Sequence, residues 1–474
     1  MPPAYPLRVS ENGHFLRQAD GSPFFYLADT AWLLFGKLTP DEADELFADR
    51  AAKGFTAVQA CVFRDLFEPN TPNAAGVRPF ATEEDMRAVR MDPAWLAFVV
   101  AVVRRAGERG LTMALLPTWG DKWNEHSNSA GPVIMDRDRA RRYCRQVSDA
   151  LAGCENVIWV LGGDSPIRSQ ADADTIAAMA EGLRAGGSAD RLITFHPEGQ
   201  DSTAALHAQP WLDVAATQSS HFRLNFPNYT HVERLFHARP IKPVIDLEAN
   251  YEGIPLFATA WHGLQAPADA VFSAYDVRKS YHRAVLAGAA GHAYGAEPVR
   301  QVFRPGDRNH GAEGGPLPTW REGLALPGSS QLGLLKRELL GRSYVSRVPA
   351  QELVKPHRQM AAWADPLNVG IPSAVQTNTD PVARISAARC TEGSWVMAYM
   401  PVRQMLWLDV GGLASERLRL RVFDPETGAL LDDRELDKPR AYSQPKYVPM
   451  HDEDGLLLYV PTRDLDTLFV VDAL

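Results

Sequence analysis

Short apolar segments alternate with amphipathic helical segments over the first three-quarters of the chain, and this alternation restricts the possible folds more than any other feature. Most of the apolar segments lack a strict polar-apolar alternation, as is typical of parallel strands covered on both faces. The eight segments begin at Pro23, Phe55, Leu111, Asn156, Arg191, Asp213, Lys242 and Gly291. Strands that each precede a helix predict an α/β fold, a (β/α)8 TIM barrel. An open doubly wound sheet is the alternative, but it usually has fewer repeats and a Gly-rich phosphate turn, and the sequence has no GxGxxG or Walker motif.

The predicted helices have recognisable ends. Thr39 is the expected N-cap of the first long helix, with Pro40 in its first turn and Gly54 after its end. The same signals flank a helix over residues 92–110. The fifth helical segment, over residues 202–212, has the weakest pattern.

After about residue 346 the pattern changes to short alternating strands separated by turn signals, with no helical segment between them. We therefore predict two domains, as the length of 474 residues also favours. A catalytic barrel with an N-terminal β-hairpin is predicted over residues 1–346, and a small antiparallel β-sandwich over 347–474. The sandwich strands carry no cluster of acidic residues, so we expect an accessory domain with no catalytic residue. Trp407 lies in an apolar segment and is expected in the sandwich core.

Composition and charge exclude some classes of partner. The formal net charge of −9 and the lack of a basic patch argue against nucleic acid or an anionic membrane. The first residues lack the apolar segment of a secretory signal, and no segment is long enough to span a membrane. The sequence as given predicts a cytoplasmic protein, or a periplasmic or secreted one if a signal was removed. The four cysteines show no CxxC or metal-ligand spacing and are expected to be buried thiols.

Acidic, imidazole and aromatic side chains follow the predicted strands. In a barrel of this kind the active site is built at the C-terminal ends of the strands. The residues at or just beyond these ends are Asp29, Trp32, Trp119, Asp121, Trp123, Asp164, His196, His221, Asp246, Glu248, Tyr251, Glu252, His292 and Tyr294. Each of them alone has a structural explanation, such as packing or a buried hydrogen bond. Their convergence on one rim favours a binding or catalytic site.

Carboxylates at the ends of the fourth and seventh strands suggest a reaction. Asp164 follows an apolar strand and two glycines, so it is either the N-cap of the next helix or part of a site. Carboxylates on these two strands face each other across a barrel and can flank one bond, as glycoside hydrolysis requires. On the seventh strand Glu248 is favoured because it lies nearer the strand end than Asp246, which is expected in a hydrogen-bond network lower in the barrel. Glu252 is the main alternative.

A series of ordered motifs resembles a known family. The motifs are FFYLADTAWLLF, PNAAGVRPF, PTWGDKWN, VIWVLGGD, TFHPEGQDS, QSSH, DLEANYEGIP and GHAYG. In this order they resemble the apiosidase-like glycoside hydrolases, family 140, over nearly the whole chain. The resemblance implies a barrel followed by a small β-sandwich of the type once labelled collagen-binding. It also implies a retaining hydrolase of plant pectic or apiose-containing glycans or glycosides, with Asp164 as the acid/base and Glu248 as the nucleophile.

Two departures from the family pattern concern the substrate rim. Ala249 follows Glu248 where the family usually has proline, and residues 298–301 replace an aromatic residue that often follows the GHxYG motif. We expect both differences to affect sugar specificity more than chemistry.

The remaining strand-end residues are expected to bind the substrate, because tryptophan faces suit sugar rings and polar groups suit hydroxyls. They are Asp29, Trp32, Trp119, Asp121, His196, His221, Tyr251, Glu252, His292 and Tyr294. The acid/base scheme requires no cofactor and no metal. We expect a carbohydrate partner, no nucleic acid or membrane partner, and a monomer or weak homo-oligomer.

Four other functions are alternatives to this one. The protein could be a glycosidase of different sugar specificity, or a non-catalytic carbohydrate-binding protein on the same barrel. A metal-dependent hydrolase is disfavoured because such barrels generally carry His-x-His on the first strand, where this chain has residues 27–30, LADT. A serine hydrolase is disfavoured because no GxSxG motif occurs.

Overall fold

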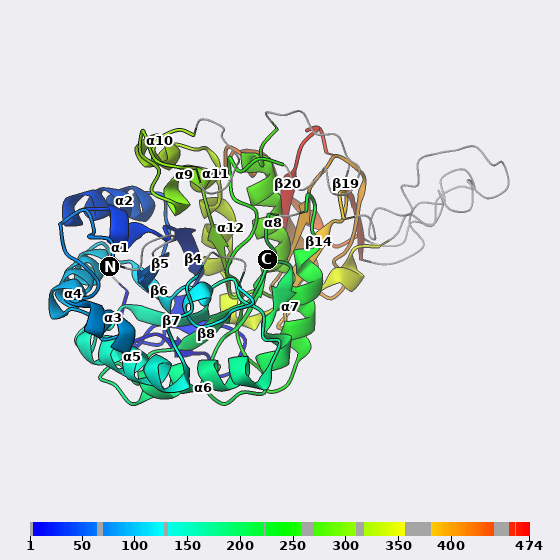
Figure 1. Cartoon of the computed structure of the whole chain (residues 1–474). Helices are drawn as coiled ribbons and strands as arrows, with labels where there is room; N and C mark the ends of the chain where they lie inside the picture. The colour runs from blue at the N-terminus through cyan, green and yellow to red at the C-terminus, as the bar shows by residue number, and fades with distance from the viewer. Residues whose placement is uncertain are drawn as a thin grey trace, which may run out of the picture. The chain divides into compact units, whose positions relative to one another are not determined.

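The computed structural model describes residues 3–63, 70–127, 131–221, 223–256, 270–309, 317–355, 381–439, 455–459 and 461–474. A nine-stranded, mostly parallel sheet has the strand order β8-β7-β6-β5-β4-β12-β11-β10-β9 (Figure 1). Its strands are β4 (Tyr26–Thr30), β5 (Ala57–Phe63), β6 (Thr112–Thr118), β7 (Val157–Gly162), β8 (Ile193–His196), β9 (Asp201–Ser202), β10 (Ala215–Gln218), β11 (Val244–Asp246) and β12 (Gly291–Tyr294).

The ends of this sheet meet and nearly close a barrel. β4 pairs in parallel with β12, so the first and last strands of the barrel are neighbours. Between β8 and β10, the amide of Val214 donates to the carbonyl of Ile193 at 3.2 Å, and the hydroxyl of Thr194 donates to the carbonyl of Val214 at 2.8 Å. The predicted TIM barrel is therefore confirmed. The short β9 is an antiparallel addition to β10.

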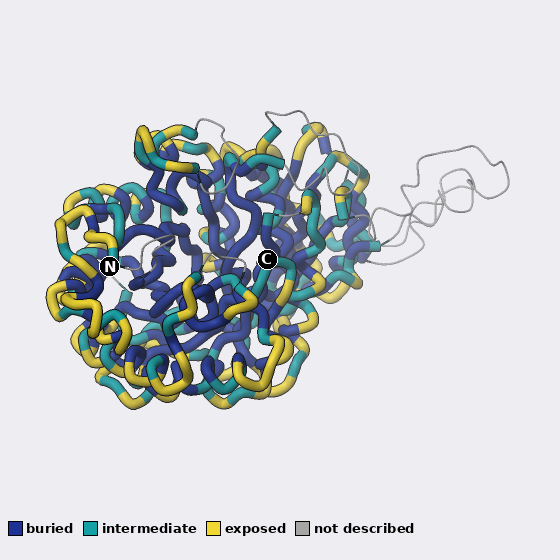
Figure 2. Tube along the Cα trace, in the orientation of Figure 1, coloured by how far each residue is buried: buried dark blue, intermediate teal, exposed yellow. Residues whose placement is uncertain are grey.

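Helices surround the barrel strands, which are buried along their length (Figure 2). The described helices are α1 (Leu34–Lys37), α2 (Pro40–Ala52), α3 (Glu83–Ala88), α4 (Pro93–Glu108), α5 (Arg137–Ala150), α6 (Gln170–Arg184), α7 (Asn228–His237), α8 (Ala274–Leu286), α9 (Glu297–Arg300), α10 (Trp320–Leu324), α11 (Gly328–Gln331) and α12 (Gly333–Leu340). The weak fifth helical segment contains only a 3-10 helix, η2 (Thr203–Leu206).

The predicted helix ends are confirmed. The Thr39 side chain accepts a hydrogen bond from the amide of Glu42, whose carboxylate bonds back to the Thr39 amide in a capping box. Asp92 accepts from the amide of Ala94 at the start of α4. Beyond the ends of α2 and α4, Gly54 and Gly110 have φ of 84° and 76°, a region that glycine enters without a Cβ penalty.

Two antiparallel sheets follow in the C-terminal part and fit the predicted β-sandwich. The larger has the order β13-β14-β15-β20-β17-β18, and the smaller pairs β16 with β19. Their strands are β13 (Arg347–Pro349), β14 (Ser386–Cys390), β15 (Trp395–Met400), β16 (Leu406–Asp409), β17 (Arg417–Phe423), β18 (Leu430–Asp437), β19 (Leu456–Tyr459) and β20 (Thr467–Ala473). Trp407 is buried, as expected of a core position. At the other end of the chain, β1 (Arg8–Val9), β2 (Leu16–Arg17) and β3 (Pro23–Phe24) form a small antiparallel sheet.

Two further predictions concern the cysteines and membrane-spanning segments. All four cysteines, Cys61, Cys144, Cys154 and Cys390, are free and buried, which confirms the expectation from their spacing. In the part of the chain that the structure describes, no helix combines the length and apolarity that crossing a membrane requires.

The chain divides into two compact units that are not contiguous in sequence. The first comprises residues 1–224, 234–277 and 289–333, and the second comprises 225–233, 278–288 and 334–474. Within the second unit, the guanidinium of Arg278 donates two hydrogen bonds to the carboxylate of Asp466, at 2.7 and 2.8 Å. The Tyr399 hydroxyl donates to the same carboxylate at 2.9 Å. A buried ion pair thus connects part of α8 with the C-terminal strands.

We predict that Asp466→Ala destabilises the protein by about 3–5 kcal/mol, because it removes the carboxylate that accepts two hydrogen bonds from the buried guanidinium of Arg278. The side chains of this pair are 2% and 0% exposed. Asp433→Ala is the matched control, since Asp433 also forms a bidentate pair with an arginine, Arg419, but those side chains are 46% and 30% exposed. The control should cost under about 1 kcal/mol. Equal losses in the free energy of unfolding, measured by urea denaturation, would contradict this interpretation.

Candidate active site

Glu248 lies just beyond the end of β11, and it is only 5% exposed. The Nε2 atom of His196 is 3.1 Å from Oε2 of Glu248, and Nδ1 of His221 is 3.8 Å from Oε1. The Tyr251 hydroxyl also donates a hydrogen bond to this carboxylate. Burial would raise the pKa of Glu248, but the hydrogen bond and charge of His196, together with His221 and Tyr251, lower that pKa to about 2. Glu248 is therefore an ionised carboxylate at neutral pH.

The imidazole of His196 connects the two segments that carry the predicted acids. Its Nδ1 atom is 3.2 Å from both the amide nitrogen of Asp164 and the carbonyl oxygen of Pro197. In the neutral form with a proton on Nε2, Nδ1 accepts from Asp164; in the doubly protonated form, Nδ1 donates to Pro197. Nε2 carries a proton in both forms. The remaining tautomer would direct a lone pair at the Glu248 carboxylate, so we assign the proton to Nε2.

Aromatic side chains from four strand ends surround this pair. The indole N–H of Trp32 donates to the Tyr251 hydroxyl at 3.0 Å, so Tyr251 is oriented with its proton towards Glu248. The rings of Trp32 and Trp119 meet edge to face at 5.0 Å, and the Trp32 ring lies 5.4 Å from that of His196. The ring of His221 stacks on Tyr251 at 5.4 Å. The structure thus gathers these five predicted residues around Glu248: Trp32, Trp119, His196, His221 and Tyr251.

Asp164 lies in a strained turn and does not cap a helix. Its φ is 55°, and Gly162 and Gly163 before it have φ of 93° and 89°. Three successive residues are thus in the left-handed region, which aspartate enters more readily than most residues with a Cβ but still at a cost. The next helix, α6, begins six residues later, and its N-cap is Ser169, which forms a capping box with Asp172. The helix-cap explanation of Asp164 is therefore wrong, and strain of this kind is typical of functional sites.

Asp29 and Asp121, two of the acids predicted to bind substrate, have buried cationic partners. Asp29 accepts a hydrogen bond from the guanidinium of Arg50 at 2.5 Å, and both side chains are fully buried. Asp121 accepts from the ammonium of Lys122 at 3.0 Å. Both acids lie at strand ends as predicted, but their ion pairs are with Arg50 and Lys122, away from the Glu248 carboxylate. Their role in substrate binding stays a prediction.

Glu252, the alternative to Glu248, is held in a separate network. Its carboxylate accepts a hydrogen bond from the Tyr294 hydroxyl at 2.6 Å and one from the amide of Gly328 at 3.0 Å. These donors hold the carboxylate between β12 and α11. The surroundings of Glu248, with two imidazoles and a tyrosine, therefore favour Glu248 as the chemical group. Substrate contacts of Glu252 and Tyr294 stay predictions.

Asp246 lies in a buried hydrogen-bond network, as the sequence analysis expects. It accepts from the amide and the hydroxyl of Ser219, at 3.2 and 2.7 Å. Nδ1 of His292 lies 3.6 Å from Oδ2 of Asp246, the oxygen that also accepts from the Ser219 hydroxyl, and burial lowers the pKa of His292 against the opposing effect of Asp246. His292 therefore contacts Asp246, and its predicted contact with substrate is untested.

Sequence reasoning missed a buried ion pair beside the site. Arg300, at the end of α9, donates two hydrogen bonds to Glu297 at 2.5 and 2.6 Å, and its Cζ lies 5.6 Å from the centre of the Tyr251 ring. Burial lowers the pKa of His221 to about 4, with Glu248 opposing this shift and Arg300 adding to it. His221 is thus neutral at neutral pH. The one sequence feature that pointed to Arg300 was the expected departure of residues 298–301 from the family pattern.

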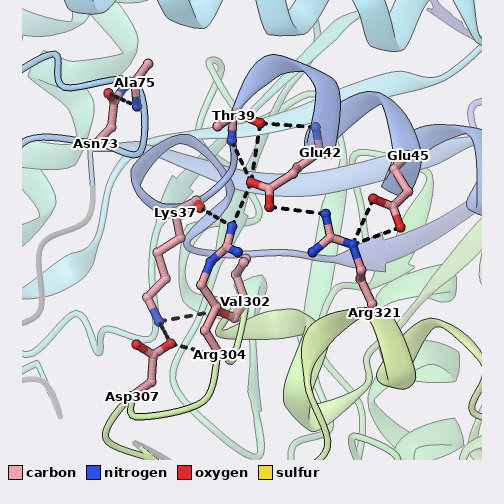
Figure 3. Close-up of polar contacts among 10 residues, drawn as sticks. All are labelled: Lys37, Thr39, Glu42, Glu45, Asn73, Ala75, Val302, Arg304, Asp307 and Arg321. Atoms are coloured by element: carbon pink, nitrogen blue, oxygen red, sulfur yellow. Dashed lines mark hydrogen bonds and ion pairs between the residues drawn. The ribbon is translucent and has the colours of Figure 1, made fainter.

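A polar cluster fixes the segment that follows α9 (Figure 3). Glu42, at the start of α2, accepts from Arg304 at 2.7 Å and from Arg321 at 3.2 Å, while Lys37 pairs with Asp307 at 2.7 Å. Burial opposes the shift, but the hydrogen bonds from these arginines and from the Thr39 amide lower the pKa of Glu42 to about 2. The cluster ties the segment after Arg300 to α1 and α2, and so supports the position of α9 beside the site.

Within the described ranges, no three histidine, cysteine, aspartate or glutamate side chains are grouped so that they could hold a metal ion. What the residues around Glu248 offer is an ionised carboxylate, hydrogen-bond donors and aromatic faces.

Two solved structures share this fold over nearly their full length. One, described as "Glycoside hydrolase", has a TM-score of 0.79 and 24% identity, covering 99% of this chain and 97% of its own. The other is a glycoside hydrolase family 5 protein from Bacteroides vulgatus ATCC 8482, with a TM-score of 0.79 and 24% identity, covering 98% and 93%. A search of curated proteins found no match. At this identity the structures establish the fold.

The barrel, its rim of acidic and aromatic residues and the family match together define the class of the protein as a glycoside hydrolase. The family described as "Apiosidase-like, catalytic domain" matches residues 10–346, well over half of the chain. The chain therefore belongs to the apiosidase-like family. This confirms the resemblance inferred from the ordered motifs.

The left-handed turn gives a stability prediction. Ser169→Ala should lower the free energy of unfolding by about 1 kcal/mol, because it removes the cap of α6. The free energy of unfolding of Asp164→Gly should stay within about 0.5 kcal/mol of the wild-type value. Glycine has no Cβ penalty at positive φ, and this gain offsets its greater conformational entropy in the unfolded state. Urea denaturation measures both. A loss of more than about 1 kcal/mol in Asp164→Gly would show that its side chain stabilises the fold after all.

The histidine donor gives a pH prediction. The pKa of Glu248 is lower in the folded protein, at about 2, than its ordinary 4.5, so ionised Glu248 stabilises the fold above pH 4.5, and this contribution is lost as the pH falls through about 2. His196→Phe removes the donor and leaves burial less opposed, so the pKa of Glu248 should rise. We expect the acid limb of the kcat/KM profile, which reports the free enzyme, to move to higher pH.

His207→Phe is the control for that experiment, because Nε2 of His207 bonds to the carbonyl of Pro240 and not to the candidate site. Its acid limb should coincide with that of the wild type. An unchanged limb in His196→Phe would contradict the role of His196 as the donor to Glu248.

Proposed function

We propose that the protein is a retaining glycoside hydrolase in which Glu248 is the nucleophile and Asp164 the acid/base. The observation that carries the proposal is the state of Glu248, a buried carboxylate kept ionised by hydrogen bonds from His196 and Tyr251. A nucleophilic carboxylate must be charged when it attacks, and it must be desolvated to react well. The surroundings of Glu248 meet both requirements.

The position of Asp164 supports its role. It follows the barrel strand β7, whereas Glu248 follows β11, so the two acids come from the fourth and seventh barrel strands. The amide of Asp164 is bonded to the same imidazole that donates to Glu248. Asp164 is half-buried, so its carboxylate can still reach a substrate.

The reaction then proceeds in two steps. Glu248 attacks the anomeric carbon while Asp164 gives its proton to the departing glycosidic oxygen, forming a glycosyl-enzyme and a free hydroxyl. Asp164 then takes a proton from water, whose oxygen attacks the anomeric carbon and releases Glu248. The sugar leaves with its configuration retained, and both carboxyl groups return to their starting states.

The substrate that we propose is a plant pectic or apiose-containing glycan or glycoside, as the family membership supports. Trp32 and Trp119, whose rings lie next to each other and to His196, are the aromatic side chains that would contact the sugar. A glycosidase acting on another sugar is the second candidate, since residues 298–301 and Ala249 differ from the family at the rim. A screen of aryl glycosides and pectic oligosaccharides separates these two.

The catalytic assignment is tested with the substrate that this screen identifies. Glu248→Gln should lose activity whatever the leaving group, because the attacking group is gone. Asp164→Asn should lose on the order of 100-fold or more on the natural substrate. On an activated phenol glycoside its first step should be spared, because phenolate departs without protonation. Added azide should then rescue the second step and give a glycosyl azide of retained configuration.

Two outcomes would overturn the assignment. One is an Asp164→Asn enzyme as active as the wild type on the natural substrate. The other is a product of inverted configuration from the wild type, which would also require a wider separation of the two carboxyl groups, roughly 6.5–9.5 Å instead of about 5–5.5 Å.

A further inference from the structure

We propose that Trp123 is a positioning residue for Asp164, acting through the backbone of the turn that carries this acid. The inference rests on the proposed acid/base role of Asp164. Trp123 lies in the segment after β6, and its indole N–H donates a hydrogen bond of 3.0 Å to the carbonyl oxygen of Gly162. It is 5% exposed, so water does not compete for this bond.

Two further donors from the same segment hold the turn on both sides of Asp164. The amide of Gly120 donates to the carbonyl of Gly163 at 3.0 Å. The side-chain amide of Asn124 donates to the carbonyl of Pro166 at 2.7 Å. The segment after β6 therefore binds the carbonyls of Gly162, Gly163 and Pro166.

The turn requires such support because its conformation is unfavourable. Residues 162 to 164 all have positive φ, and Asp164 has a Cβ that resists this region. A strained backbone persists only where its surroundings hold it. Without the bonds to the three carbonyls, the peptide planes on either side of Asp164 could rotate, and the carboxylate would move with them.

The segment after β6 packs so closely against the turn at residues 162–164 that a shift of one would move the other. A Cβ on Gly163 would lie 2.8 Å from the amide nitrogen of Gly120, and a Cβ on Gly120 would overlap the hydroxyl of Ser165. The backbones are therefore in direct contact, with no side chain between them. General acid catalysis depends on placing the proton within hydrogen-bond reach of the leaving oxygen, so a small displacement of the turn should affect this step first.

Trp123→Phe tests the proposal, because phenylalanine keeps an aromatic ring but lacks the N–H. On a substrate with a poor leaving group, kcat/KM should fall by about 10-fold or more, and on an activated phenol glycoside it should stay within about twofold of the wild type. The matched control is Trp95→Phe. Trp95 is 3% exposed and donates its indole N–H to the carbonyl of Val62 at 3.1 Å, outside the turn. The change in kcat/KM caused by Trp95→Phe should be the same for both leaving groups.

A double-mutant cycle shows whether Trp123 acts through Asp164. In an Asp164→Asn background, Trp123→Phe should cause no further loss of kcat/KM on the poor leaving group, because the proton is already missing. Asn124→Asp is a second variant for the case in which Trp123→Phe does not fold. It removes the donor to Pro166 but keeps the oxygen that accepts from the amide of His126, and it should show the same leaving-group split.

The outcomes separate this inference from the proposed function. An equal loss on both substrates, or a loss that adds in full to that of Asp164→Asn, would overturn the positioning role alone. If the wild type hydrolyses no glycoside, both the proposed function and this inference fail. The positioning role is supported if Trp123→Phe lowers kcat/KM only on the poor leaving group and if this loss disappears in the Asp164→Asn background.

Discussion

The hydrogen bond from His196 to Glu248 is the interaction on which the candidate site depends. A carboxylate that is 5% exposed would take up a proton at neutral pH unless donors replaced the water it has lost. His196 supplies one donor, and Tyr251, itself oriented by Trp32, supplies another. Because the other side of the same imidazole meets the amide of Asp164, any shift of His196 alters the surroundings of both acids. The site is therefore one connected network and not two independent side chains.

The barrel was predictable because its signals are local. Strands covered on both faces are apolar throughout, and the cap at Thr39 and the glycine at residue 54 mark helix ends without reference to the rest of the fold. β18 is different, because Leu430–Asp437 lies largely exposed and no apolar alternation in the sequence indicates a strand there. What identifies it as a strand is its pairing with β17, including the ion pair of Arg419 with Asp433. Such pairs join residues that are distant in sequence, and no local pattern contains them.

The site was predictable in part, for a related reason. Barrel topology specifies which residues stand at the rim, and this brought Trp32, His196 and Tyr251 to Glu248. It does not specify which partner a rim side chain meets, so the sequence could not show that Asp29 pairs with Arg50. Nor could it distinguish a capping aspartate from a strained one, because both follow a strand and glycines. That distinction needed the backbone angle of Asp164 and the true cap five residues later, Ser169.

The discontinuous second unit has a consequence for how this protein could have been assembled or could be re-engineered. A natural recombination event, or a chimaera made in the laboratory, exchanges contiguous stretches of gene. Because residues 225–233 and 278–288 belong to the same compact unit as residues 334–474, a single crossover that transfers the whole unit also transfers residues 234–277 and 289–333 of the first unit. A foreign sandwich joined at residue 346 would have to supply its own acid for Arg278, which is 2% exposed and bonded to Asp466. The C-terminal strands thus form one compact unit with parts of α7 and α8, and a replacement for them would have to include those helical segments.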